Sequence, residues 1–447
     1  MRTALLPALL AVMLLPLSLA QAGVELVSLP ERDSVQLTIY NAADLTLVRE
    51  LRKLTLRKGL NRLSFGWANT VIDPTSLNLR AVQRPDAVQL LDVAYPPGTN
   101  TEGIWSVQSQ LEGEVPVEIS FFTSGVTWRA FYMATLTPDE KSMHLQGYVR
   151  VTNNSGEDYE NAQTRLVVGN IHLLDQIAEL ARRTAPYGTP LHPGARPQAE
   201  EKRVLMRKAE AALDAAARLA PTRPKEIIKE SLSEYFLYTI EGTETIPHGW
   251  SKRLPSLEAH EVPVVNLYKF EEESYGKDVV RFLLFANDAR HKLGDTPLPD
   301  GLVKVFRKVD HKGHLSYEGA DNTKYIPVGQ KVELNLGPVP KVKVEPKLMK
   351  VRFENFSFNK DRNIDGWEEV EEWKLEVQNN REVDALLEIR RNFRHQHWEI
   401  KLGSEEHGKF QKVDLDTISF TMDLKPYERS TFSYSLRFFE GERRNRK

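Results

Sequence analysis

Short stretches in which apolar and polar residues alternate recur along nearly the whole chain. Residues 35–40, 115–121 and 144–151 alternate with a period of two, and turn-forming residues such as those at 58–61 and 153–156 separate these stretches. Successive side chains of a β-strand point to opposite faces, so this period is typical of strands with one buried face. The pattern predicts a mainly β fold, built of tandem β-sandwich units of immunoglobulin type.

One region interrupts the alternation. Leu173, Ile177 and Leu180 recur at helical spacing, and residues 199–220 are rich in Ala, Glu, Lys, Arg and Leu, which are strong helix formers. Because β patterns return at 235–240, we predict an α-helical insertion over 172–233, with a last helical turn near 227–235. The insertion either packs along its parent sandwich or forms a coiled coil with a partner. Its apolar stripe is too short for sustained heptads, which favours the first alternative.

The first residues have the pattern of a secretory signal peptide. Arg2 precedes an apolar stretch at 5–19, and Ala20 and Ala22 supply the small residues of a cleavage site. An uncleaved membrane anchor is the alternative, but the stretch is short for a span and contains Pro7 and Pro16. We therefore expect cleavage after Ala22, a periplasmic or secreted protein, and no integral membrane span in the mature chain.

Five segments follow from these patterns. They are a signal peptide (1–22), an N-terminal β domain (23–100), a central β domain that carries the helical insertion (101–345), a C-terminal β-sandwich (346–440) and a basic tail (441–447).

Composition excludes several classes of function. The 447 residues contain 60 Lys and Arg against 62 Asp and Glu, a net charge of −2, so no overall basic field attracts nucleic acid. The absence of cysteine excludes thiol catalysis, disulfides and thiolate zinc sites. No nucleophile elbow, metalloprotease helix, phosphate loop or dinucleotide motif is present in the sequence. We therefore predict no catalytic residue and no bound cofactor, calcium excepted.

A calcium loop is the sharpest local motif. Asp361, Asn363 and Asp365 occupy loop positions one, three and five, Gly366 position six, and Glu372 position twelve. Calcium takes six to eight hard oxygen ligands, which such a loop supplies. The flanking residues are typical of strands rather than of the helices that a calcium hand requires. A polar hairpin loop is the simpler alternative.

A second possible metal site lies at 395–399. On a strand, His395, His397 and Glu399 share one face and offer two imidazoles and one carboxylate. No fourth ligand is evident in the sequence. A polar, solvent-facing strand surface is the alternative interpretation.

Several motifs together resemble the family known as domain of unknown function 4139, whose members are sometimes described as mucoidy-inhibitor-like. They lie at 35–41, 58–61, 73–77, 125–132, 151–159 (containing NNSGEDY), 168–169, 298–305 and 332–337. The chain lacks the long coiled coil of many members, and Tyr159 stands where tryptophan is common. The resemblance implies architecture and envelope location, and it transfers no catalytic residue. Within the motifs, Trp128 and Tyr132 are predicted to be core aromatics rather than a ligand platform.

The sequence thus favours an exported binding or structural module of the bacterial cell envelope, with an envelope protein or glycan as partner and no catalysis. An extracytoplasmic metal-dependent or carbohydrate-active hydrolase is the alternative. It requires a concave pocket in which carboxylates or histidines converge.

Overall fold

The computed structural model describes residues 27–40, 44–66, 70–94, 102–168, 227–232, 235–310, 312–393, 395–405 and 407–445. Strands dominate, so the fold is mainly β, as the sequence predicts. In these ranges the helical elements are single turns: η2 (Pro85–Ala87), α3 (Glu272–Tyr275), η3 (Ala289–His291) and η4 (Glu442–Asn445). The described residues form two compact units, one of 27–34 and 49–121, the other of 35–48, 122–168 and 227–445.

The first unit has a four-stranded sheet in the order β1-β4-β7-β6. Its strands are β1 (Val27–Ser28), β4 (Gly59–Gly66), β7 (Glu102–Ser109) and β6 (Val88–Ala94). β5 (Ile72–Ala81), β8 (Gly113–Thr123) and the part of β3 (Leu45–Leu56) from residue 49 onward belong to a second sheet. Trp105 is fully buried, and its ring stacks on Phe65 with centroids 5.1 Å apart. The ring of Phe121 also contacts Phe65, with centroids 6.1 Å apart, so aromatic rings contribute to this core.

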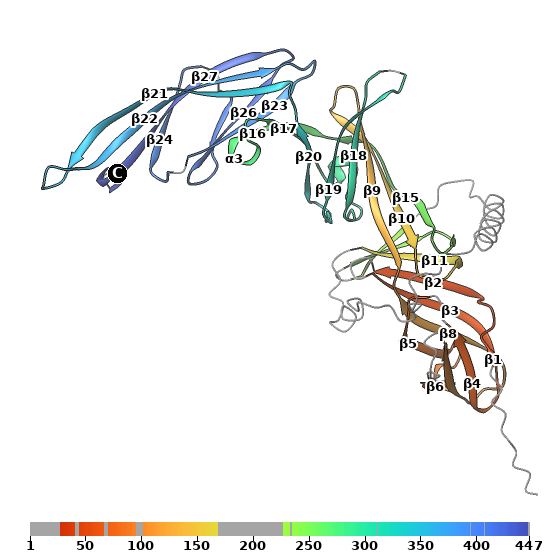
Figure 1. Cartoon of the computed structure of the whole chain (residues 1–447). Coiled ribbons are helices and arrows are strands. Elements are labelled where there is room, and N and C mark those ends of the chain that lie inside the picture. Colours follow the sequence, from red (N-terminus) through yellow and green to blue (C-terminus); the bar gives the residue numbers. More distant parts are fainter. Residues whose placement is uncertain are drawn as a thin grey trace, which may run out of the picture. The chain divides into compact units, whose positions relative to one another are not determined.

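The second unit contains a five-stranded sheet in the order β15-β10-β9-β18-β19. Its strands are β15 (Ser251–Pro263), β10 (Ser142–Asn153), β9 (Val126–Leu136), β18 (Gly301–Lys308) and β19 (Leu315–Thr323). β9, β10 and β15 run antiparallel as neighbours, whereas β18 pairs with β9 in parallel (Figure 1). Alternate residues of β9 and β10 are buried, which leaves one face of the sheet for solvent.

Further strands of this unit join β2 (Ser34–Tyr40) in the order β12-β13-β11-β2. They are β12 (Ile227–Leu232), β13 (Tyr235–Ile240) and β11 (Tyr159–Val168), and β14 (Glu244–Ile246) pairs with β11. The predicted helical insertion falls mostly outside the described residues. Its last part was predicted wrongly, because Ile227–Leu232 is a strand that pairs along its length with β13. Backbone pairing with β13 and the β-branched pair at 227–228 favour the extended form there.

Two sheets pack face to face near the C-terminus and share one core. One has the order β20-β17-β16-β23-β26-β25 and the other β21-β22-β27-β24 (Figure 1). Their strands are β16 (Val265–Glu271), β17 (Val279–Ala286), β20 (Lys331–Pro338), β21 (Val342–Phe358), β22 (Ile364–Asn379), β23 (Ala385–Asn392), β24 (Trp398–Leu402), β25 (Lys409–Lys412), β26 (Thr417–Leu424) and β27 (Arg429–Gly441). In this core the ring of Phe420 stacks on Tyr434 and contacts Phe432 in a tilted arrangement. β16, from the predicted central domain, pairs in parallel with β23 from the predicted C-terminal one.

Three fully buried asparagines stand at or directly after the ends of strands β10, β17 and β22. The side-chain amide of Asn153 donates to the carbonyls of Glu157 (2.7 Å) and Ile246 (2.8 Å). Asn287 and Asn379 each donate to three loop carbonyls in the same way. Buried carbonyls need donors, and one amide supplies several. The asparagines therefore fix the loops that follow these strands.

A buried ionic network surrounds Glu140 in the β9–β10 turn. Its carboxylate contacts Arg281 at 3.0 Å, Arg381 at 2.6 Å and Arg307 at 3.4 Å. Glu318 accepts from Arg281 at 2.6 Å. Only about 4% of the Arg281 side chain is exposed, so its charge depends on these carboxylates.

No helix in the described part of the chain is long and apolar enough to cross a membrane.

Candidate anion-binding site

Three arginines form a row across strands β9, β10 and β15. Arg129 is the register partner of Arg150, and Arg150 is the register partner of Arg253, so all three side chains leave the same face of the sheet. All are exposed. Neighbouring strands lie about 4.8 Å apart, so the row spans about 10 Å. We call these three residues the arginine row.

The arginine row is electrostatically unfavourable in the free protein. Like charges directly opposite each other destabilise a sheet. No carboxylate of a described residue forms an ion pair with any of the three guanidinium groups. An anion that binds along the row would remove this repulsion and accept charge-assisted hydrogen bonds from planar donors.

Aromatic rings lie next to the arginine row on the same face. Phe131 and Tyr148 are register partners, and their rings stack with centroids 5.6 Å apart. The guanidinium carbon of Arg253 lies 3.6 Å from the centroid of Tyr148 and 5.3 Å from that of Phe131. This cation–π contact orients Arg253 and leaves an apolar surface beside the charges.

A pocket of about 710 Å³ includes the arginine row. Lys304 of β18 adds a fourth cationic side chain to the three of the arginine row. Asp300, which directly precedes β18, adds one carboxylate, so the lining has a net charge of +3. Its lining comprises Arg129, Ala130, Phe131, Tyr132, Met133, Arg150, Arg253, Asp300, Gly301, Leu302, Lys304, Asn322 and Thr323. The volume is in the range of ligand sites, about 300–1,000 Å³.

Two buried tyrosines hold the segment that closes this pocket at the start of β18. Tyr132 donates to the carbonyl of Pro299 at 2.9 Å, and Tyr238 donates to that of Pro297 at 2.5 Å. Burial raises the pKa of Tyr132 well above its usual value and that of Tyr238 to about 12. Both hydroxyls therefore stay protonated, and both remain donors, across the physiological pH range. Burial of Tyr132 agrees with its prediction as a core aromatic.

Residues 117–438 match the family model described as "Domain of unknown function (DUF4139)". The chain belongs to this family. The arginine row and the pocket lie within the matched residues. No curated protein matches the chain.

The geometry explains two glycines within the matched residues. Gly125 has φ +79°, and a Cβ there would lie 2.9 Å from the backbone of Asn154 in the NNSGEDY segment. Gly301 abuts the carbonyl of Ala130 so closely that a Cβ would overlap it. Both positions therefore require glycine, at turns that set the ends of β9, β10 and β18.

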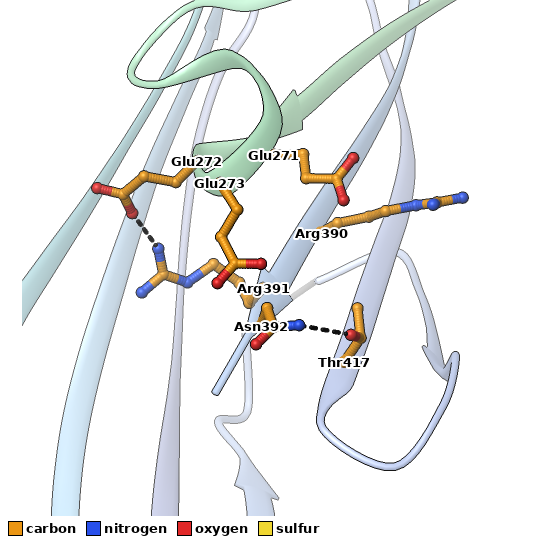
Figure 2. Close-up of a pocket in the computed structure, with 7 residues that line it drawn as sticks. All are labelled: Glu271, Glu272, Glu273, Arg390, Arg391, Asn392 and Thr417. Carbon is orange, nitrogen blue, oxygen red and sulfur yellow. Dashed lines mark hydrogen bonds and ion pairs between the residues drawn. The ribbon is translucent and has the colours of Figure 1, made fainter. Parts of the chain in front are cut away.

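A second, smaller pocket of about 360 Å³ lies between α3 and the ends of β23 and β26. Figure 2 shows Glu272 directed at Arg391, whose Nη1 lies 2.9 Å from the carboxylate, and Asn392 directed at Thr417. Arg391 also lies over the ring of Trp373, and Arg390 pairs with Glu388. The arginines of this pocket already have partners, so it is the weaker candidate for an anion.

The residues of the predicted calcium loop do not meet at one point. Asp361 and Asn363 lie in the turn between β21 and β22, Asp365 lies at the start of β22, and Glu372 lies seven residues farther along that strand. Seven residues of strand extend about 23 Å. Glu372 instead pairs with Arg352 at 2.8 Å. The loop is a strand-to-strand hairpin, and calcium binding there stays a prediction.

The second predicted metal site is likewise not assembled. His395 precedes β24 and pairs with Glu440 at 3.0 Å, while its ring packs on Phe438. His397 also precedes the strand, and only Glu399 lies in it, next to Arg437 of β27. The alternation of side chains that was expected to align the three residues does not extend back to His395. Metal binding by this set stays a prediction.

Sequence reasoning missed the arginine row, although it identified both strands that carry Arg129 and Arg150. Each arginine alone is an ordinary exposed residue at a polar position of a strand. The signal is the register, which aligns them, and the register of strands that are distant in sequence is not readable from alternation.

Proposed function

We propose that this DUF4139 protein is an exported, non-catalytic binding module of the cell envelope, and that the arginine row holds an anionic ligand. The single observation that carries the proposal is the alignment of Arg129, Arg150 and Arg253 without carboxylate partners among the described residues. Exposed like charges in register weaken a sheet, and a bound anion offsets that cost.

The ligand class that fits best is an acidic glycan. Guanidinium groups bind carboxylates and phosphates in a bidentate manner, and the row presents several along about 10 Å. Phe131, which lines the pocket, supplies an apolar surface for a sugar ring beside the charges. A single small anion would use only part of the row.

We infer further that the sheets are tandem sandwiches of immunoglobulin type. The signal-like N-terminus supports export to the periplasm or beyond. The pocket lining supports binding rather than hydrolysis, because it offers one carboxylate, Asp300, and acid–base cleavage of a glycosidic bond uses two.

The test is calorimetric titration of the mature protein with oligogalacturonate, with inorganic phosphate and with neutral maltohexaose at low salt. We expect oligogalacturonate to bind, phosphate to bind more weakly and maltohexaose not to bind. Substitution of Arg150 by Gln should weaken oligogalacturonate binding about 10-fold or more, since a hydrogen bond to a charged group contributes about 1.5–3 kcal/mol. Equal binding of wild type and this variant would overturn the proposal.

The matched control is Arg352→Gln, which removes an exposed strand arginine that is not part of the pocket lining. It should leave binding unchanged. Release of reducing ends from oligogalacturonate during incubation would instead favour the hydrolase alternative.

A further inference from the structure

Two histidines and a glutamate converge on the solvent-facing side of strands β10 and β15. Nε2 of His144 lies 3.0 Å from Oε1 of Glu258, and Nε2 of His260 lies 3.6 Å from the same oxygen. The imidazole rings are stacked, with centroids 4.2 Å apart and planes 12° from parallel. One potential ligand atom from each of the three residues lies within 4.8 Å of the others.

A β-bulge builds this cluster. Leu145 pairs with Ala259 and Met143 with Val262, so two residues of β15, His260 and Glu261, oppose the single His144. Glu261 has φ +52°, a left-handed conformation that is unfavourable for a residue other than glycine. Bulges redirect side chains, and this one places His260 beside His144 while Glu258 stays on the same face.

Neighbouring charges leave the cluster free to bind a cation. The carboxylate of Glu261 is 2.7 Å from the ammonium group of Lys292. Glu261 therefore neutralises the positive charge of Lys292, which would otherwise repel a metal ion. The proposed site does not need Glu261 as a ligand. The side chains of His144, Glu258 and His260 are 30%, 56% and 69% exposed, so a metal could enter from solvent and keep water ligands.

We propose that His144, Glu258 and His260 form a binding site for a divalent transition metal, with Zn²⁺ as the first choice. Two imidazoles and a carboxylate on one side, with open positions on the other, are a ligand set that suits Zn²⁺, Ni²⁺ and Cu²⁺. The cluster is separate from the arginine row, because Arg150 lies six residues from His144 along β10, about 20 Å. The proposal is thus independent of the anion-binding function.

The experiment is titration of ZnCl₂ into untagged mature protein, followed by calorimetry, with the variants His144→Asn and His260→Asn. We expect one Zn²⁺ to bind per chain. Loss of a residue that only supports a metal ligand weakens binding about 10- to 100-fold, so loss of a ligand itself in either variant should weaken binding at least as much. His314→Asn, which removes an exposed histidine outside the cluster and outside the set at 395–399, is the matched control and should bind like wild type.

A second measurement does not depend on the folding of variants. Electron paramagnetic resonance of the wild-type protein with one equivalent of Cu²⁺ should show hyperfine coupling to two imidazole nitrogens. The proposal is overturned if the double variant of His144 and His260 retains wild-type Zn²⁺ affinity, or if wild-type Cu²⁺ shows no imidazole nitrogen.

Discussion

Replacement of Arg150 by glutamine should make the free protein more stable, although it removes a binding residue. Arg150 is the middle member of the arginine row and has a like charge on each side. Exposed guanidinium groups on strands about 4.8 Å apart can spread to about 7 Å, and at that separation in water two unit charges repel by about 0.6 kcal/mol. Two neighbours therefore cost about 1.2 kcal/mol before screening. Glutamine keeps much of the aliphatic stem, so little packing is lost.

The change of this stabilisation with salt concentration tests whether charge repulsion is its cause. The Debye length is about 30 Å at 0.01 M and about 3 Å at 1 M ionic strength, so about 1 kcal/mol of the repulsion remains at the lower value and about 0.1 kcal/mol at the higher. We expect Arg150→Gln to raise the urea midpoint, with an unchanged slope, at 0.01 M salt and to have almost no effect at 1 M. Urea unfolding followed by circular dichroism at both concentrations measures this difference.

The Arg352→Gln control should behave in the opposite way. Arg352 pairs with Glu372 at 2.8 Å, both half exposed, so its loss should destabilise by at most about 1 kcal/mol, and more at low salt. If Arg150→Gln is less stable than wild type at low salt, or if its effect does not change with salt, the repulsion argument is wrong.

Three further predictions concern the second unit. Glu140→Gln should destabilise by about 3–5 kcal/mol in urea unfolding because it leaves the Arg281 charge buried without one of its carboxylates; a loss below about 1 kcal/mol would contradict this. The pKa of Glu318 is below its unfolded value of 4.5, because bonds from Arg307 and Arg281 outweigh the opposing effect of burial. Its ionised form therefore stabilises the fold above pH 4.5, and this contribution is lost as pH falls, so wild type should lose more stability than Glu318→Gln between pH 6 and about pH 3. Gly301→Ala should cost about 1–3 kcal/mol, since a Cβ would overlap the Ala130 carbonyl, and wild-type stability of this variant would refute the requirement for glycine.

The strands were largely predictable, and so was the burial of Trp128 and Tyr132. Alternation is a local property, so each strand can be recognised without its neighbours. The prediction failed at Ile227–Leu232, where pairing with β13 decided the conformation. It also could not anticipate parallel pairs such as β16 with β23, which join strands far apart in the chain.

The candidate sites likewise depend on strand pairing that local sequence patterns do not reveal. The sequence placed metal ligands at 395–399 by assuming a continuous strand, while the structure assembles His144, Glu258 and His260 through a bulge. A bulge shifts the register by one residue and changes which side chains meet, and alternation alone does not reveal it.

By itself, the sequence determined a mainly β chain with one buried and one exposed face on many strands, because side-chain alternation and turn residues act within a few positions. Only the tertiary structure decided that three exposed arginines stand in one row and that two histidines stack beside a glutamate. Both arrangements depend on the register between separate strands, which is set by the packing of whole sheets and not by any single strand.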